Sequence, residues 1–158
     1  MRSFSSYYRT HPTEADDDGY LKNAQGQIVR SANQVAIGRK HFQRLNGNRT
    51  THLDDGYNLR GRGLIQITGY EKYSGYMNDY KKYWNDQGPD TVNNPALINE
   101  MPHAIRSALW FWIEKKPYMG DKGNGLADVS DVTYIVNGGY NGLSERQKAY
   151  REIEDIIK

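Results

Sequence analysis

The sequence contains no cysteine, and its apolar content is low. Without cysteine it has no disulfide framework, although this absence does not indicate a cellular compartment. Apolar residues make up 37% of the chain, and no run is long and apolar enough to predict a transmembrane helix. A signal-peptide pattern is also missing. We therefore expect a protein made in the cytoplasm, which needs another module or a secretion system to reach a target outside it.

The chain also lacks a large excess of charge of one sign, and its histidines lack the spacing of metal ligands. The chain has 21 basic and 19 acidic residues, and a net charge of +2 is too small to indicate nucleic-acid binding. It is compatible with an anionic polymer as a partner. The four histidines, His11, His41, His52 and His103, share no metal-ligand spacing, so we expect no metal and no cofactor.

Aromatic residues are abundant. Thirteen tyrosines and three tryptophans supply bulk to the core while offering hydroxyls and ring faces at the surface, as sugar-binding proteins often do. A length of 158 residues suits one domain, 1–158, with its own core. The hydrophobic pattern predicts a mostly α (α+β) fold, helical with one small β-sheet.

The expected elements follow from capping residues and periodicity. Residues 1–26 are polar and turn-rich, and 64–68 alternate as a strand does. Five helical segments are expected. The most apolar of them is 103–114, which we expect at the centre of the core. The expected helices are 31–45 (capped by Ser31, with Val35, Phe42 and Leu45 buried), 70–84 (Tyr73, Tyr76, Tyr80 and Trp84 on one face), 103–114, a short helix capped by Ser130 and ending at Gly138, and a last helix with Ser144 and Gln147 as a capping box.

The segment 58–73 is the most informative of the chain. If 64–68 is a strand, Gln66 and Thr68 share one face with Leu64. A face with an amide and a hydroxyl suits the hydroxyl and N-acetyl groups of a glycan. The alternative is a strand with one face in water.

Three ordered motifs resemble the family-19 glycoside hydrolases, which include chitinases and the peptidoglycan lysozymes of phages and secretion systems. The first motif is GRGLIQITG at 61–69. The second is NPAL at 94–97 with AIRSALWFW at 104–112, and the third is IVNGGYNGL at 135–143, followed by Arg146 and Tyr150. This resemblance implies a lysozyme-like fold and hydrolysis of β-1,4-linked N-acetylhexosamine polymers.

The resemblance also implies a catalytic glutamate that this sequence lacks. The family's acid lies in a His-Glu motif upstream of the GRG motif, and residues 1–8 are similar to the segment that would follow it. A second family glutamate is most similar in position to Gln43, which cannot ionise. We expect the chain to be the C-terminal part of a longer polypeptide that carries the acid; an unusual acid in its place is the alternative.

Glu14 is the best candidate acid within the chain. It lies beside Asp16, Asp17 and Asp18, and like charges raise one another's pKa, as a general acid requires. One alternative is a solvated acidic loop. The other is a calcium loop, with Glu14, Asp16 and Asp18 at its first, third and fifth positions, although Gln25 stands where a glutamate is expected.

The resemblance implies substrate-binding roles that each have a structural alternative. Asn137 alternatively ends a helix, and Arg146 is alternatively a surface residue. For Arg62 the alternative is a buried ion pair of the scaffold that holds the loop. Trp110 and Trp112 are expected in the core. The implied substrate-binding residues are Arg62, Gln66, Thr68, Tyr70, Asn137 and Arg146.

The sequence therefore predicts a monomeric glycoside hydrolase that acts on the cell wall, with peptidoglycan favoured over chitin. The chain is free of cysteine, and it resembles the phage and effector members more than the disulfide-bearing plant chitinases. No membrane or nucleic-acid partner is expected. The alternatives are a chitinase, a wall-binding module without catalysis, and a toxin fragment whose cleft an immunity protein blocks.

Overall fold

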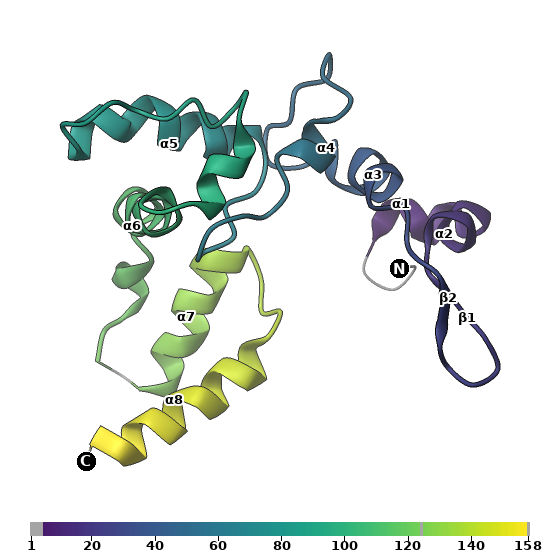
Figure 1. Cartoon of the computed structure of the whole chain (residues 1–158). Coiled ribbons are helices and arrows are strands. Elements are labelled where there is room, and N and C mark those ends of the chain that lie inside the picture. The colour runs from purple at the N-terminus through teal and green to yellow at the C-terminus, as the bar shows by residue number, and fades with distance from the viewer. Residues whose placement is uncertain (1–4, 124, 158) are drawn as a thin grey trace. The chain divides into compact units, whose positions relative to one another are not determined.

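The computed structural model describes residues 5–123 and 125–157, which are mostly helical (Figure 1). Within these residues, the regular sheet is one antiparallel pair of short strands, β1 (Leu21–Lys22) and β2 (Ile28–Arg30). The predicted class, mostly α with a small β-sheet, is confirmed. The chain comprises two compact units, Met1–Ala108 and Leu109–Lys158. None of the helices in the described ranges combines the length and apolarity needed to cross a bilayer.

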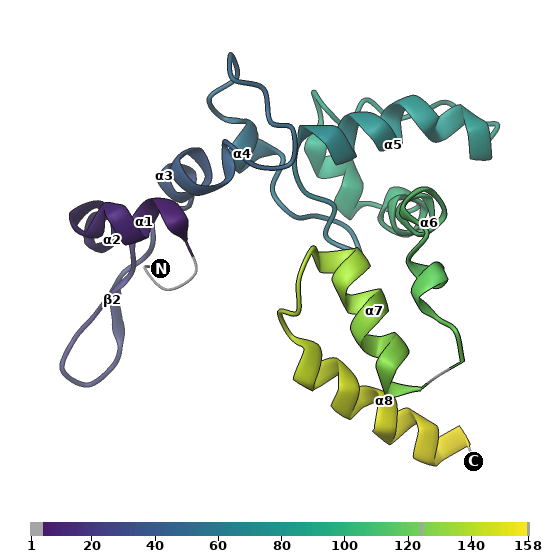
Figure 2. The same ribbon diagram turned by 180° about the vertical axis from the view of Figure 1, so that it is seen from behind.

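The N-terminal segment folds into two helices and a hairpin (Figure 2), so the expectation of a turn-rich stretch is wrong. Helix α1 (Ser6–Thr10) begins where the Ser5 hydroxyl accepts a hydrogen bond from a backbone N–H, and α2 (Pro12–Asp18) begins at a proline. The buried Tyr8 hydroxyl donates to Asp18, 2.8 Å away, which joins the two helices. The strands β1 and β2 of the hairpin form the sheet that was predicted at residues 64–68.

The predicted helix 31–45 is shorter and partly π-helical. Helix α3 (Gln34–Ile37) is capped by Asn33, not by Ser31, and continues as the π-helix η1 (Gly38–Phe42). Of the three residues expected to be buried, Val35 and Phe42 are half-buried and Leu45 is exposed. The expected stripe is therefore wrong.

Close backbone contact explains the packing of η1 on α4 (Asp55–Asn58). A Cβ atom on Gly38 would lie 2.6 Å from the Cβ of Tyr57, and one on Gly56 would lie 2.3 Å from the carbonyl oxygen of Gly38. Both positions therefore exclude any side chain.

Helix α5 (Tyr70–Tyr83) matches the predicted helix, and its buried face is the predicted one. Tyr73, Tyr76 and Tyr80 are fully buried, as their helical spacing indicates. The buried Thr91 hydroxyl donates to the carbonyl of Tyr73, which holds the following loop against the helix. That loop leads through the 3-10 helix η2 (Pro95–Asn99) to α6.

Helix α6 (His103–Lys115) begins in the first unit and continues into the second. Trp110 is buried, with 3% exposure, as predicted. However, Leu109, Trp112 and Ile113 are 41–50% exposed, so the expectation of a helix buried on nearly all sides is wrong, and so is the core position of Trp112.

The rest of the second unit consists of the 3-10 helix η3 (Pro117–Gly120) and the packed helices α7 (Leu126–Asn137) and α8 (Leu143–Ile157). Gly125 caps α7, and Ser130 lies inside that helix, which corrects the expected start. The end at Gly138 is confirmed, because this residue adopts the left-handed conformation with φ 65°. Ser144 lies within α8, where its hydroxyl donates to the carboxylate of Glu145.

Candidate functional site

Residues 61–69 form a tight turn, so the predicted strand at 64–68 is wrong. Arg62 and Ile67 form an isolated antiparallel bridge, and the N–H of Gln66 donates to the carbonyl of Gly63, 3.2 Å away. Gly63 and Gln66 have positive φ values of 71° and 58°. Two left-handed residues reverse the chain where an alternating apolar pattern indicates extension.

The turn brings the side chains of Gln66 and Thr68 together over Gly61. A Cβ on Gly61 would lie 2.8 Å from Gln66 Oε1 and 3.3 Å from Thr68 Oγ1. The Gln66 amide nitrogen donates to the carbonyl of Gly63, and the Thr68 hydroxyl donates to the carbonyl of Gln66; each donor–acceptor distance is 2.9 Å. Gln66 Oε1 accepts no hydrogen bond from the described residues, so it can accept one from a ligand.

Arg62 lies beneath this turn with 8% exposure. Its guanidinium donates to the carbonyl of Asn58 and, over 3.0 Å, to the hydroxyl of Tyr73. The same hydroxyl donates to the carbonyl of Arg60, 2.7 Å away. The geometry therefore favours the scaffold role of Arg62, which holds the turn on α5 through carbonyl and hydroxyl partners.

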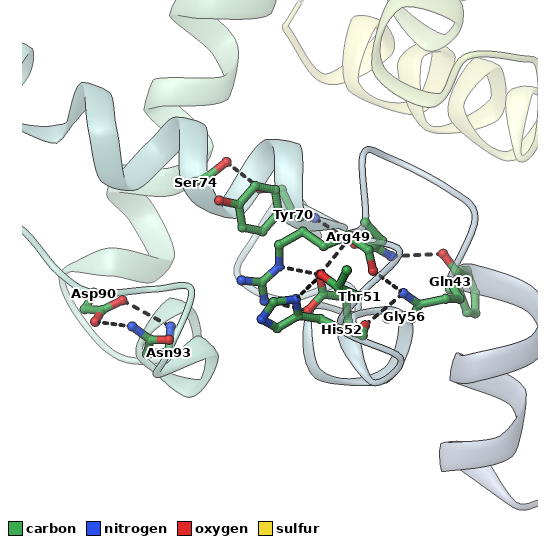
Figure 3. Close-up of polar contacts among 12 residues, drawn as sticks. Gln43, Arg49, Thr51, His52, Gly56, Tyr70, Ser74, Asp90 and Asn93 are labelled. Carbon is green, nitrogen blue, oxygen red and sulfur yellow. Dashed lines mark hydrogen bonds and ion pairs between the residues drawn. The ribbon is translucent and has the colours of Figure 1, made fainter.

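A partly buried ion pair lies beside Tyr70, at the start of α5 (Figure 3). Asp55 is 4% exposed and accepts two hydrogen bonds from the Arg49 guanidinium, over 2.7 and 2.8 Å, and a third from the Arg49 backbone N–H. The Arg49 guanidinium stacks on the Tyr70 ring at 4.5 Å, and the backbone N–H of Tyr70 donates to Asn48. Tyr70 is thus fixed by contacts that its sequence position alone does not reveal.

Next to this ion pair lies an open, mostly polar cavity of about 460 Å³. Its exposed polar lining includes His52, whose Nδ1 is 3.0 Å from the Thr51 hydroxyl, and Asn58. Sequence reasoning missed this cavity. The signal that could have found it is the density of polar residues in the loop at 46–56. The lining residues are Arg49, His52, Leu53, Asp54, Asp55, Asn58, Val92, Asn93 and Pro95.

Gln43, the position most similar to a family glutamate, holds this loop together (Figure 3). Its amide nitrogen donates to the carbonyls of Arg49 and His52, both over 2.9 Å, and its amide oxygen accepts from the backbone N–H of Gly56. A carboxylate could not donate the first two bonds. An amide is therefore the side chain that this position requires.

The carboxylates of the cavity are held ionised. Burial acts to raise the pKa of Asp55, but the hydrogen bonds from Arg49 outweigh it and hold that pKa below its usual range. The Arg39 guanidinium likewise lowers the pKa of Asp54. Neither group is therefore suited to donate a proton near neutral pH.

Asp55→Asn is expected to lower the free energy of unfolding by about 1.5–3 kcal/mol, because it removes charge-assisted hydrogen bonds to Arg49. The folded-state pKa of Asp55 is lowered, so this contribution is present above the unfolded-state pKa and is lost as the pH falls through the folded-state value. Urea denaturation from neutral to acidic pH should show the difference shrinking. Asp54→Asn, in a pair that is half exposed, is the control with a smaller effect. A difference that stays constant into acid would contradict the assignment.

Glu14 has a lowered pKa, so the expected rise from its acidic neighbours is wrong. The Lys40 ammonium, 2.7 Å away, lowers it most; burial opposes this, and hydrogen bonds from the Tyr7 hydroxyl lower it further. Lys40 also pairs with Asp18, 2.6 Å away, so one ammonium lies between two carboxylates of the acidic cluster. The pKa values of Asp86, Asp90 and Glu145 are lowered as well.

The calcium-loop interpretation is wrong. Glu14, Asp16 and Asp18 lie on α2, a helix, and the residues after Gly19 form the hairpin. A calcium loop needs an irregular backbone that turns several oxygens inward. Within residues 5–123 and 125–157, no cluster of three or more histidine or acidic side chains could hold a metal ion.

Asn137 and Arg146 lie in the second unit and converge on one carbonyl. Asn137 is the last residue of α7, and its amide donates to the carbonyl of Asn141, 3.2 Å away. The Arg146 guanidinium donates to the same oxygen over 2.7 Å. These hydrogen bonds hold the α7–α8 loop. Both side chains are exposed, so their remaining N–H groups face solvent.

Comparison with known proteins supports the family resemblance. No model of a known protein family matches the chain. The chain is 36% identical over 120 residues to a protein of Haemophilus influenzae named glycosyl hydrolase family 19 domain-containing protein. The match covers 76% of this chain and 52% of that protein, so the chain spans about half the length of this relative. A relationship between this chain and the family-19 glycosyl hydrolases is therefore supported.

Proposed function

We propose that this chain is the glycan-binding part of a glycoside hydrolase that cleaves β-1,4 bonds in N-acetylhexosamine polymers. The observation that carries the proposal is the turn at 61–69, where the side chains of Gln66 and Thr68 lie together and Gln66 Oε1 can accept a hydrogen bond. An acetamido N–H with neighbouring hydroxyls matches this pair. The family-19 relative supports the same class of reaction.

Bacterial peptidoglycan is the substrate we favour over chitin. The chain has no cysteine, and it resembles the phage and effector lysozymes of the family more than the disulfide-bearing plant chitinases. Action on peptidoglycan places the protein at the cell wall after synthesis in the cytoplasm. An immunity protein that covers the turn is a partner compatible with an effector role.

The general acid is proposed to lie in a polypeptide segment upstream of Met1. The lowered pKa values of Glu14, Asp54 and Asp55 favour ionised carboxylates, whereas the acid of a glycosidase must hold a proton. The same observation favours the second candidate function, a wall-binding module without catalysis. Activity of an upstream-extended polypeptide distinguishes the two.

Gln66→Ala is expected to weaken glycan binding by about 1–2 kcal/mol, which is the scale of one lost hydrogen bond. Binding to purified peptidoglycan and to chitin should be measured by co-sedimentation, with the melting temperature measured in parallel. Gln25→Ala, an exposed glutamine in the hairpin, is the matched control and should bind normally. A large fall in melting temperature with unchanged binding would make Gln66 a scaffold residue and remove the main support for this proposal.

A further inference from the structure

The second unit carries an apolar groove along α8. A cavity of about 570 Å³ is lined by Trp112, Tyr118, Val132, Tyr150 and Ile153, among others. A shallower pocket of about 220 Å³ shares Tyr150 and Ile153 and continues along the helix to Ile157. We call this continuous surface the α8 groove. An apolar surface of this shape can receive apolar side chains of a partner.

The same helix also carries a protruding apolar end. Ile156 is 83% exposed and Ile157 is 78% exposed, at the C-terminal end of α8. Ile157 forms the end wall of the shallower pocket and Ile156 lines neither pocket, so the space of the groove is not filled by these side chains of its own chain. Two copies can fill each other's grooves, because a twofold axis brings the same surface of each copy against the other.

Charges along α8 favour an antiparallel arrangement of the two copies. Arg146 lines one end of the groove and Glu154 lies near the other. Lys148 and Arg151 precede Glu152 and Asp155 along the helix, whereas Glu145 places one acid in its first turn. Antiparallel pairing sets the basic part of one α8 beside the acidic part of the other.

We propose that two copies of this chain form a symmetric dimer through antiparallel α8 helices, each placing Ile156 and Ile157 in the α8 groove of the other. The sequence predicts a monomer. In a sequence, a helix whose apolar stripe packs within its own chain looks the same as one whose stripe is exposed. The dimer goes beyond the proposed glycan binding, which depends on the first unit.

The first test is the mass of the full 158-residue chain in solution, measured by sedimentation over a wide range of concentrations. The chain should dimerise, and Ile156→Asp combined with Ile157→Asp should weaken the dimer by at least about 100-fold, because two charges would be buried. Both side chains are exposed in the single chain, so the variant should fold, which circular dichroism checks. Ile28→Asp, an equally apolar exposed site on the hairpin, should leave the dimer intact.

A charge exchange tests the orientation. Arg146→Glu and Glu154→Arg should each weaken the dimer by about tenfold, and the double variant should restore it. A chain that is monomeric at every concentration overturns the proposal. If such a monomer binds an apolar dye in its groove, the groove is accessible but does not bind a second copy, and the proposal is overturned as well. A dimer that survives the double aspartate variant assigns the interface to another surface and overturns it equally. A dimer that the charge exchange fails to restore overturns the antiparallel arrangement.

Discussion

The 158-residue chain alone is expected to bind peptidoglycan but to hydrolyse it about 10²–10⁴ times more slowly than a polypeptide that also carries the proposed upstream acid. The physical reason is that glycosidic cleavage requires a proton on the leaving oxygen. Lys40 and Tyr7 stabilise the charged form of Glu14, so this carboxyl is a poor proton donor. Clearing of cell-wall suspensions and release of reducing ends measure the two rates.

Glu14→Gln in the extended polypeptide is the control for this prediction. It should leave the rate nearly unchanged, because Glu14 contributes an ion pair with Lys40 and no catalytic proton. If the 158-residue chain is fully active and Glu14→Gln abolishes hydrolysis without unfolding it, Glu14 is the acid and the upstream proposal fails. If both the bare chain and its Glu14→Gln variant are active, neither account of the acid holds.

Trp110→Ala is expected to lower the free energy of unfolding by about 3–5 kcal/mol, because it empties a large buried site on α6. Urea denaturation at neutral pH measures this loss. Trp112→Ala is the matched control on the same helix: its ring is 41% exposed, so less apolar surface returns to water and the cost should be clearly smaller. A stable Trp110→Ala variant that has lost only glycan affinity would place this ring at the binding surface.

The periodicity of α5 and the end of α7 could be predicted from the sequence because they depend on neighbouring residues. The spacing of Tyr73, Tyr76 and Tyr80 marks one face of α5, and any fold that buries α5 on that face buries all three. Gly138 ends α7 because a left-handed residue is easiest for glycine. The motifs that carry the family resemblance were also readable in this way.

The turn at 61–69 could not be predicted, because contacts with distant residues outweigh its local alternation. The backbone N–H of Gly63 donates to the Asn99 side chain over 3.3 Å, and that of Leu64 donates to the carbonyl of Ala104 over 3.4 Å. These partners come from η2 and α6, so they secure a left-handed turn where strand propensity alone favours extension. The proximity of Gln66 and Thr68 was expected from a strand, but it arises from this turn.

The sequence by itself determined the helical class, the tyrosine-rich face of α5, the end of α7 and the family-19 resemblance, since all of these depend on local periodicity, capping or residue identity. Only the tertiary structure decided the electrostatics of the site. The pKa of Glu14 is lowered because Lys40 approaches it from η1, and Asp55 is paired because the loop at 46–56 folds Arg49 onto it. A pKa depends on the charges and burial around a group in space, and sequence neighbours are a poor guide to both.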